Sequence, residues 1–187
     1  MNRDSGFAIT FTPSRWLVWW LVFVALAALS CGAPSQAESE SDALNRGIQA
    51  QNSGNVDAAT AAYFETLRAN PKNKYAFYNL GQIARVANRF VAAEAYYRLA
   101  LEIDPDFGAA LFGLAYVRSA AGATQEAIDL YGHAVRVEPE NAPAHYNRGL
   151  LLRSIGRVAE GDAEIARGRQ LDPNLGAPAT PGASPTK

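Results

Sequence analysis

The sequence predicts an all-α fold, an alpha-alpha superhelix built from four helix–turn–helix repeats. The first observation is a period of 34 residues that separates the prolines Pro71, Pro105, Pro139 and Pro173. The second is that each interval contains two segments with the apolar spacing of amphipathic helices. The third is a residue suited to ending a helix and reversing the chain between those segments, namely Gly54, Asn88, Gly122 and Gly156.

Residues 1–30 have the pattern of a secretory signal peptide. Arg3 and Arg15 precede an uncharged run, 16–29 (WLVWWLVFVALAAL), and small residues follow it. The uncharged stretch continues to Ala33, and at roughly 18 residues it is close to the shortest length that spans a membrane as a helix. Because both arginines precede the run, either alternative places the rest of the chain outside the cytoplasm.

Cys31 is the only cysteine, so an intrachain disulfide is excluded. The residues before it, 28–30 (ALS), resemble the lipobox of bacterial lipoproteins, in which small and aliphatic residues precede an acylated cysteine. The match departs from that pattern at Ala28, where leucine is usual. The resemblance implies that Cys31 carries a lipid anchor and that Gly32, which follows it, favours the outer membrane.

Two alternatives to the lipid anchor stay open. The apolar run could remain as an uncleaved transmembrane anchor, or cleavage could follow Ala37 and release a soluble periplasmic protein. In each case, residues 31–39 are expected to form a short flexible tether before the repeats.

The prolines divide the repeat region into four units, 40–73, 74–107, 108–141 and 142–175. We expect first helices at 41–53, 75–87, 109–121 and 143–155, and second helices at 56–69, 90–103, 124–137 and 158–171. In each unit the eighth and twentieth places hold small residues and the twenty-fourth a large one, as in Gly81, Ala93 and Tyr97. Small residues let the two helices approach closely, and the large one fills the gap beside them.

Two segments of the second unit carry a family resemblance. They are 78–81 (YNLG) in the first helix and 97–105 (YRLALEIDP) at the end of the second. Together with the fourfold register, they resemble the tetratricopeptide repeat family over residues 40–175. The resemblance implies stacked helical hairpins whose first helices line a concave face that binds other proteins.

The fourth unit differs from the others. Glu164, Gly168 and Arg169 stand where the other units have apolar or small residues, which predicts a capping helix with a polar outer face. Residues 176–187 contain three prolines and no apolar periodicity, so we expect a disordered tail.

Composition and motifs exclude most chemistry. With 17 basic and 18 acidic residues, the chain has no basic field for nucleic acid. His133 and His145 are the only histidines, and no metal-ligand spacing, phosphate loop or nucleophile–histidine–acid set is present. We expect His145 to be partly buried structure. We therefore expect no enzyme activity, no cofactor, no metal and no small-molecule substrate.

In the tetratricopeptide repeat family, places two, five, nine, twelve and thirteen of each unit face the groove. This implies a partner-binding groove made of Tyr75, Tyr78, Gln82, Arg85, Phe112, Tyr116, Ser119, Tyr146, Leu150 and Arg153. Aromatics beside arginines are typical of protein-binding hot spots. An alternative for Tyr78, Phe112 and Tyr146 is that they mainly cover the contacts within each hairpin.

A second groove chemistry is disfavoured. Chaperone-binding members of the family hold a peptide's terminal carboxylate with an asparagine at place six, helped by groove lysines. Asparagines stand there at Asn45, Asn79 and Asn147, but the helper places hold Leu44, Ile48, Tyr75 and Gly113. Without those cations a carboxylate clamp is weak.

The sequence therefore predicts an exported, non-enzymatic scaffold or adaptor of the bacterial cell envelope, anchored in the membrane and facing the periplasm. Its partner is another protein or peptide in the concave groove. The alternative function is an assembly factor for an envelope machine of the pilus or secretin type.

Overall fold

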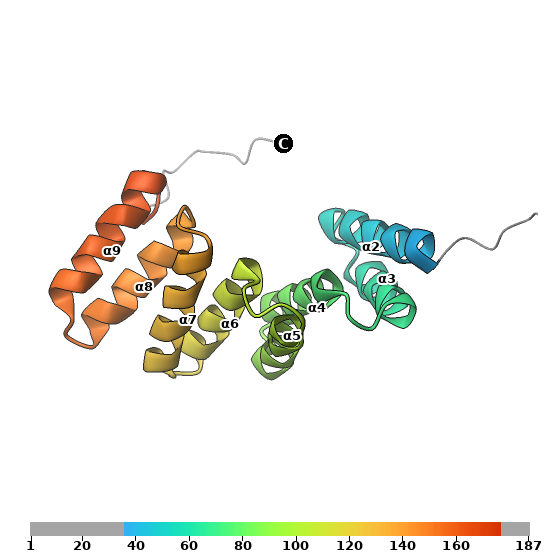
Figure 1. Ribbon diagram of the computed structural model, residues 1–187, viewed down its shortest axis with the longest axis horizontal. Helices are drawn as coiled ribbons and strands as arrows, with labels where there is room; N and C mark the ends of the chain where they lie inside the picture. Colours follow the sequence, from blue (N-terminus) through green and yellow to red (C-terminus); the bar gives the residue numbers. More distant parts are fainter. Residues whose placement is uncertain (1–35, 177–187) are drawn as a thin grey trace, which may run out of the picture.

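A computed structural model of the chain describes residues 36–176 (Figure 1), and these residues form helices without strands. The helices are α2 Gln36–Asn52, α3 Val56–Ala69, α4 Lys74–Val86, α5 Phe90–Ile103, α6 Gly108–Ala120, α7 Thr124–Val137, α8 Ala142–Ser154 and α9 Val158–Leu171. They follow one another as four antiparallel hairpins along the long axis of the molecule, from α2–α3 to α8–α9. The predicted all-α superhelix is confirmed.

The four second helices have the predicted bounds, whereas α4, α6 and α8 begin and end one residue before the prediction. Side-chain caps explain two of these starts. The amide oxygens of Asn73 and Asn141 accept hydrogen bonds from the backbone N–H of Ala76 and Ala144, at 2.8 and 3.1 Å. A capping residue lies just outside the helix, so α4 begins at 74, directly after Asn73, and α8 begins at 142, directly after Asn141.

Helix α2 begins at Gln36, five residues before the prediction, and so includes 36–39, which we expected to be tether. The stretch 36–46 lacks both Gly and Pro and is rich in Ala and Glu. Alanine and glutamate favour helix, and no breaker separates 36–39 from the predicted helix, so the helix extends to the residues just after Pro34.

The turns inside the four hairpins share one geometry. Each has a residue with positive φ, from 56° at Asn88 to 85° at Gly156. The backbone N–H after that residue closes on the last turn of the first helix, as when Arg89 donates to the Ala84 carbonyl at 2.8 Å. This is the Schellman closure that Gly or Asn permits at a helix end, as the sequence predicted.

Close helix approach occurs at the predicted small residues. Tyr63, Tyr97 and Tyr131 are fully buried, and an added Cβ on Gly81 would lie 2.7 Å from the Tyr97 ring. The tyrosine therefore occupies the space that a side chain at place eight would need. Each buried cluster joins one hairpin to the first helix of the next, so the core continues along the stack.

A ring of four ion-paired side chains on α5, α6 and α7 joins the second hairpin to the third. Glu94 pairs with Arg98 and Arg118, at 3.0 and 3.2 Å, and Glu126 pairs with the same two arginines, at 3.2 and 2.6 Å. Burial alone would raise the pKa of Glu94, but hydrogen bonds from both arginines outweigh it and lower that pKa.

The capping helix α9 is mostly exposed on its outer side, but two of the three residues predicted for that face lie elsewhere. Gly168 is buried, and the Glu164 side chain is only 19% exposed. The Glu164 carboxylate contacts His145 Nδ1 at 2.6 Å and accepts from Arg148 at 2.5 Å, both on α8. His145 is thus half-buried structure, as predicted, and of the three only Arg169 is exposed.

The predicted signal peptide, Cys31 and the tail from residue 177 lie outside the described residues. Within 36–176, none of the helices has the length and apolar character needed to cross a membrane. In the same range, His, Cys, Asp and Glu side chains do not gather in threes at a position that could hold a metal ion.

Candidate functional site

The first helices α4, α6 and α8 present the predicted groove residues. Three of them are well exposed despite being large and apolar, namely Tyr75 at 50%, Leu150 at 45% and Tyr116 at 41%. Exposed aromatic side chains on neighbouring first helices make these helices the candidate surface for a partner.

A hydrogen-bond network fixes the polar part of α4. Gln82 is its centre, since its Nε2 donates to the Tyr78 hydroxyl oxygen at 2.7 Å. Gln82 Oε1 accepts from Arg85 Nε at 3.1 Å and from the Tyr97 hydroxyl at 3.0 Å. Three of the predicted groove residues, Tyr78, Gln82 and Arg85, are therefore held in one arrangement before any partner binds.

Arg85 extends from α4 to the next hairpin. Its guanidinium carbon lies 5.1 Å from the centre of the Tyr116 ring on α6, a cation–π contact. Burial raises the pKa of Tyr97 and of Tyr131 to about 12, and the nearby positive charge of Arg85 opposes this rise at both. Arg85 therefore lies close to tyrosines of three helices, Tyr97 of α5, Tyr116 of α6 and Tyr131 of α7.

The large residues at place twenty-four, which the sequence predicts to fill the gap between the helices, include the tyrosines Tyr63, Tyr97 and Tyr131. In the structure their hydroxyls reach polar side chains of the first helices, because a buried hydroxyl needs a partner. Tyr63 donates to Gln51 Oε1 at 2.7 Å, and Asn147 Nδ2 donates to the Tyr131 oxygen at 3.4 Å. The sequence signal for these hydrogen bonds was the tyrosine at place twenty-four, because leucine there would carry no hydroxyl.

The aromatics of place five, Tyr78, Phe112 and Tyr146, are half-buried. Tyr78 packs edge-on against Phe107 with centroids 5.4 Å apart, and Phe112 packs against Tyr131 at 5.5 Å. Tyr146 lies under the guanidinium of Arg169 and beside Gly176. All three thus cover contacts within their own hairpins and show only part of their rings to the groove.

Phe107 was not among the predicted groove residues, although it supports two of them. It lies directly before α6, and its ring packs edge-on against Tyr75 at 5.5 Å as well as against Tyr78. The only sequence signal that Phe107 belongs beside the groove was its position at the end of the second unit, directly before an apolar first helix.

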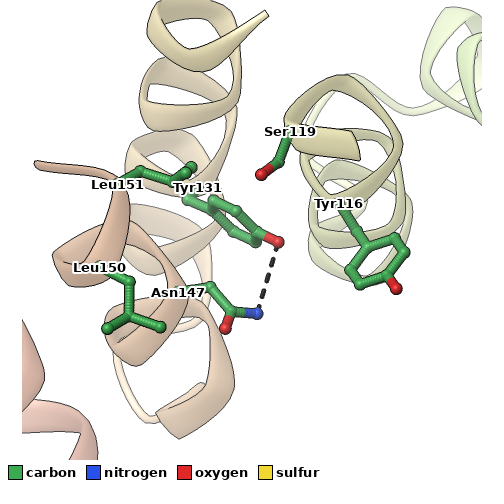
Figure 2. Close-up of a pocket in the computed structure, with 6 residues that line it drawn as sticks. All are labelled: Tyr116, Ser119, Tyr131, Asn147, Leu150 and Leu151. Atoms are coloured by element: carbon green, nitrogen blue, oxygen red, sulfur yellow. Dashed lines mark hydrogen bonds between the residues drawn. The ribbon is translucent and has the colours of Figure 1, made fainter. Parts of the chain in front are cut away.

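A small hollow opens between α6 and α8 (Figure 2). It measures about 140 Å³ and is lined by Tyr116, Ser119, Tyr131, Asn147, Leu150 and Leu151. Figure 2 shows Tyr131 reaching from α7 into the space between the two first helices, with its hydroxyl towards Asn147. The hollow combines predicted groove residues with Tyr131, Asn147 and Leu151, which were not predicted to belong to the groove.

Arg153 is separate from this group. Its Nη1 pairs with Asp162 on α9 at 3.2 Å, and its side-chain stem packs beside Gly161. Both charges are more than half exposed, so water weakens this pair. Arg153 thus extends along the last hairpin rather than towards the tyrosines of α4 and α6.

Stacked helical hairpins with a continuous core and an aromatic inner surface define a helical-repeat scaffold. The sequence model of the tetratricopeptide repeat matches residues 44–107 and 112–174. The chain belongs to the tetratricopeptide repeat family, whose repeats mediate protein–protein interactions.

Two curated relatives share sequence with the repeats. The chain is 31% identical over 97 residues to the photosystem I assembly protein Ycf3 of Acaryochloris marina, covering 50% of this chain and 58% of that protein. It is 30% identical over 119 residues to a probable UDP-N-acetylglucosamine–peptide N-acetylglucosaminyltransferase, SPINDLY, of Hordeum vulgare, covering 60% of this chain. That match spans only 13% of the transferase, so the likeness concerns repeats and not the whole enzyme.

Solved structures share the fold at low sequence identity. PilF of Pseudomonas aeruginosa superimposes with a TM-score of 0.67 at 19% identity, covering 74% of this chain and 64% of PilF. YrrB, described as a repeat protein of this family with an unusual peptide-binding site, gives 0.64 at 20% identity, covering 71% and 69%. This fold is generally a non-catalytic interaction scaffold, and transferases that contain it act through other domains.

Proposed function

We propose that the protein is a non-enzymatic adaptor of the bacterial cell envelope that binds a segment of a partner protein in its concave groove. The observation that supports this best is the arrangement of Tyr75, Tyr116 and Arg85 on consecutive first helices. The two tyrosines are about half exposed, and Arg85 stacks on Tyr116. Tyrosine and arginine, with tryptophan, are enriched among the few residues that dominate binding at protein interfaces.

Preorganisation supports the same function. The network around Gln82 holds Tyr78 and Arg85 before binding, so little side-chain entropy is lost when a partner arrives. The likeness to YrrB, which is described as binding a peptide, agrees with a peptide or an extended segment as the occupant.

The test uses a double variant, Tyr116→Ala with Arg85→Ala, and crosslinking in the native envelope followed by mass spectrometry to identify the partner. Capture of that partner should fall at least tenfold while far-UV circular dichroism stays helical. The control is Val91→Ala with Arg136→Ala, two exposed positions on the second helices α5 and α7. Capture that survives in the groove variant would exclude this surface as the binding site.

For the location, we propose export and a lipid anchor at Cys31, facing the periplasm from the outer membrane. The support is the sequence of residues 1–31, with its arginines, its uncharged run and a lipobox-like ALSC. The Cys31→Ala variant should leave the membrane fraction if a lipid is the anchor. Membrane association that persists in Cys31→Ala would instead favour the uncleaved transmembrane anchor.

A second candidate is an assembly factor for an envelope machine, of the pilus or secretin type. It is favoured by the match to Ycf3, which is named as an assembly protein. This role predicts that deletion removes one specific oligomer or appendage from the cell surface. Normal assembly of these structures in the deletion strain would count against it.

A further inference from the structure

Arg85 differs from the other arginines on first helices in having no carboxylate partner among the described residues. Its contacts are with Gln82 and the ring of Tyr116. The others are all paired, as Arg46 with Glu65, Arg118 with Glu94 and Glu126, Arg148 with Glu164, and Arg153 with Asp162. The positive charge of Arg85 is thus half-buried and not neutralised within the repeats.

A comparison of the second and fourth hairpins explains why Arg85 has no carboxylate partner. Arg85 and Arg153 occupy the same place in their repeats, and Glu94 and Asp162 also share a place. In the fourth hairpin, Arg153 pairs with Asp162. In the second hairpin, Glu94 is held by Arg98 and Arg118 instead. Arg85 is therefore directed across the groove, where it packs on Tyr116.

The hollow next to Tyr116 suits one side chain. At about 140 Å³ it is well below the roughly 300–1,000 Å³ of small-molecule sites. Leu150 and Leu151 supply an apolar wall, and Ser119 supplies a hydroxyl. The Tyr131 oxygen already accepts from Asn147, so its own proton is available to a carbonyl oxygen in the hollow.

The place-six residues argue against a terminal carboxylate as the ligand. Asn147 already donates to Tyr131. In the third hairpin the place holds Gly113, whose backbone lies against the Tyr97 ring. An acidic group at Arg85 is therefore more consistent with a side chain from the middle of a segment.

We propose that the groove recognises an extended partner segment in which an acidic side chain pairs with Arg85 and a neighbouring apolar side chain enters the hollow beside Leu150. This inference rests on the proposed groove function and specifies its partner. Charge complementarity supports it, because the groove places of all four units include no carboxylate, and of their two arginines Arg153 is paired with Asp162 whereas Arg85 is not paired among the described residues.

The spacing of the two partner side chains follows from the shared wall. Tyr116 carries the guanidinium of Arg85 on its ring and also lines the hollow. An extended chain rises about 3.2–3.4 Å per residue. Successive side chains of an extended chain point to opposite faces, so we expect the acidic and apolar residues two positions apart in the partner segment.

The experiment is a selection from displayed random dodecamer peptides, fused at their C-terminus and thus without a free terminal carboxylate, on the full chain in detergent. We expect enrichment of Asp or Glu within two positions of Leu, Ile, Met or Phe. The Arg85→Gln variant should lose the acidic preference and bind the selected peptide about 10- to 100-fold more weakly. Leu150→Ser should lose the apolar preference, and the control Arg136→Gln should change neither.

Salt gives a second readout, since binding of the acidic peptide should weaken as salt rises in the wild type but hardly in Arg85→Gln. Two results would overturn the inference and leave the groove function standing. One is that peptides selected on the wild-type protein lack Asp and Glu, and the other is that Arg85→Gln still prefers acidic peptides. If no peptide is enriched, and the double variant Tyr116→Ala with Arg85→Ala captures the native partner as well as the wild type does, then both the groove function and the acidic segment are excluded.

Discussion

The packing between the second and third hairpins makes a sharp prediction at Gly113. An added Cβ there would lie 2.5, 2.7 and 2.9 Å from three carbons of the Tyr97 ring. That ring is fully buried between α4, α5 and α6, and its hydroxyl is tied to Gln82. Gly113→Ala therefore forces a buried aromatic ring or a helix backbone to move, because no flexible chain end is available to yield.

Overpacking of this kind costs about 1–3 kcal/mol. Alanine also recovers about 1 kcal/mol of helix propensity relative to glycine. The difference leaves a net loss of up to about 2 kcal/mol in the free energy of unfolding of Gly113→Ala.

The matched control is Gly132→Ala on α7. The nearest atom to its added Cβ is Arg148 Nε, at 3.3 Å and on a long side chain that can shift. This variant should keep the propensity gain and become up to about 1 kcal/mol more stable. Urea unfolding followed by circular dichroism at matched protein concentration measures both variants. If Gly113→Ala is as stable as Gly132→Ala, the close contact between α6 and Tyr97 is wrong.

Three further predictions concern the ion-pair ring, the last hairpin and a turn. The pKa of Glu94 is lowered in the folded protein, so its ion pairs contribute fully to the free energy of unfolding above the ordinary pKa of 4.5. This contribution is lost as the pH falls through the pKa of the folded state. Glu94→Gln should therefore flatten the acid side of a pH–stability curve. Leu152→Ala removes a fully buried side chain of α8 and should cost about 2–5 kcal/mol, seen as early melting of the last hairpin in hydrogen exchange. Gly122→Ala places a side chain at φ 78° and should cost about 1–2 kcal/mol in thermal unfolding, whereas Gly122→Asn should cost less.

The sequence predicted the repeat architecture well because its strongest signals are local and recur four times. Each second helix ends two residues before a proline, which disfavours helix in the residue between them, so those bounds needed no tertiary information. The start of α2 was missed although the sequence marks it. Pro34 precedes it, and Ser35 with Glu38 has the spacing of a capping box.

The details of the groove could be predicted only in part. Arg85 and Arg153 share a place in the repeat, and the sequence offered no reason to separate them. Their difference depends on the following hairpin, which offers Tyr116 to Arg85, whereas no described hairpin follows α9 to offer an aromatic to Arg153. The hollow has the same origin, since Ser119, Tyr131 and Leu150 meet only when two consecutive hairpins are stacked.

We expect the partner to bind on the first helices. The most direct test places a photo-crosslinking phenylalanine derivative at position 116 or 150 in the groove and at position 91, which is 88% exposed on α5. Irradiation of cells that produce these variants should crosslink one partner from positions 116 and 150 and not from 91. A partner that crosslinks from 91 and not from the groove positions would contradict the account.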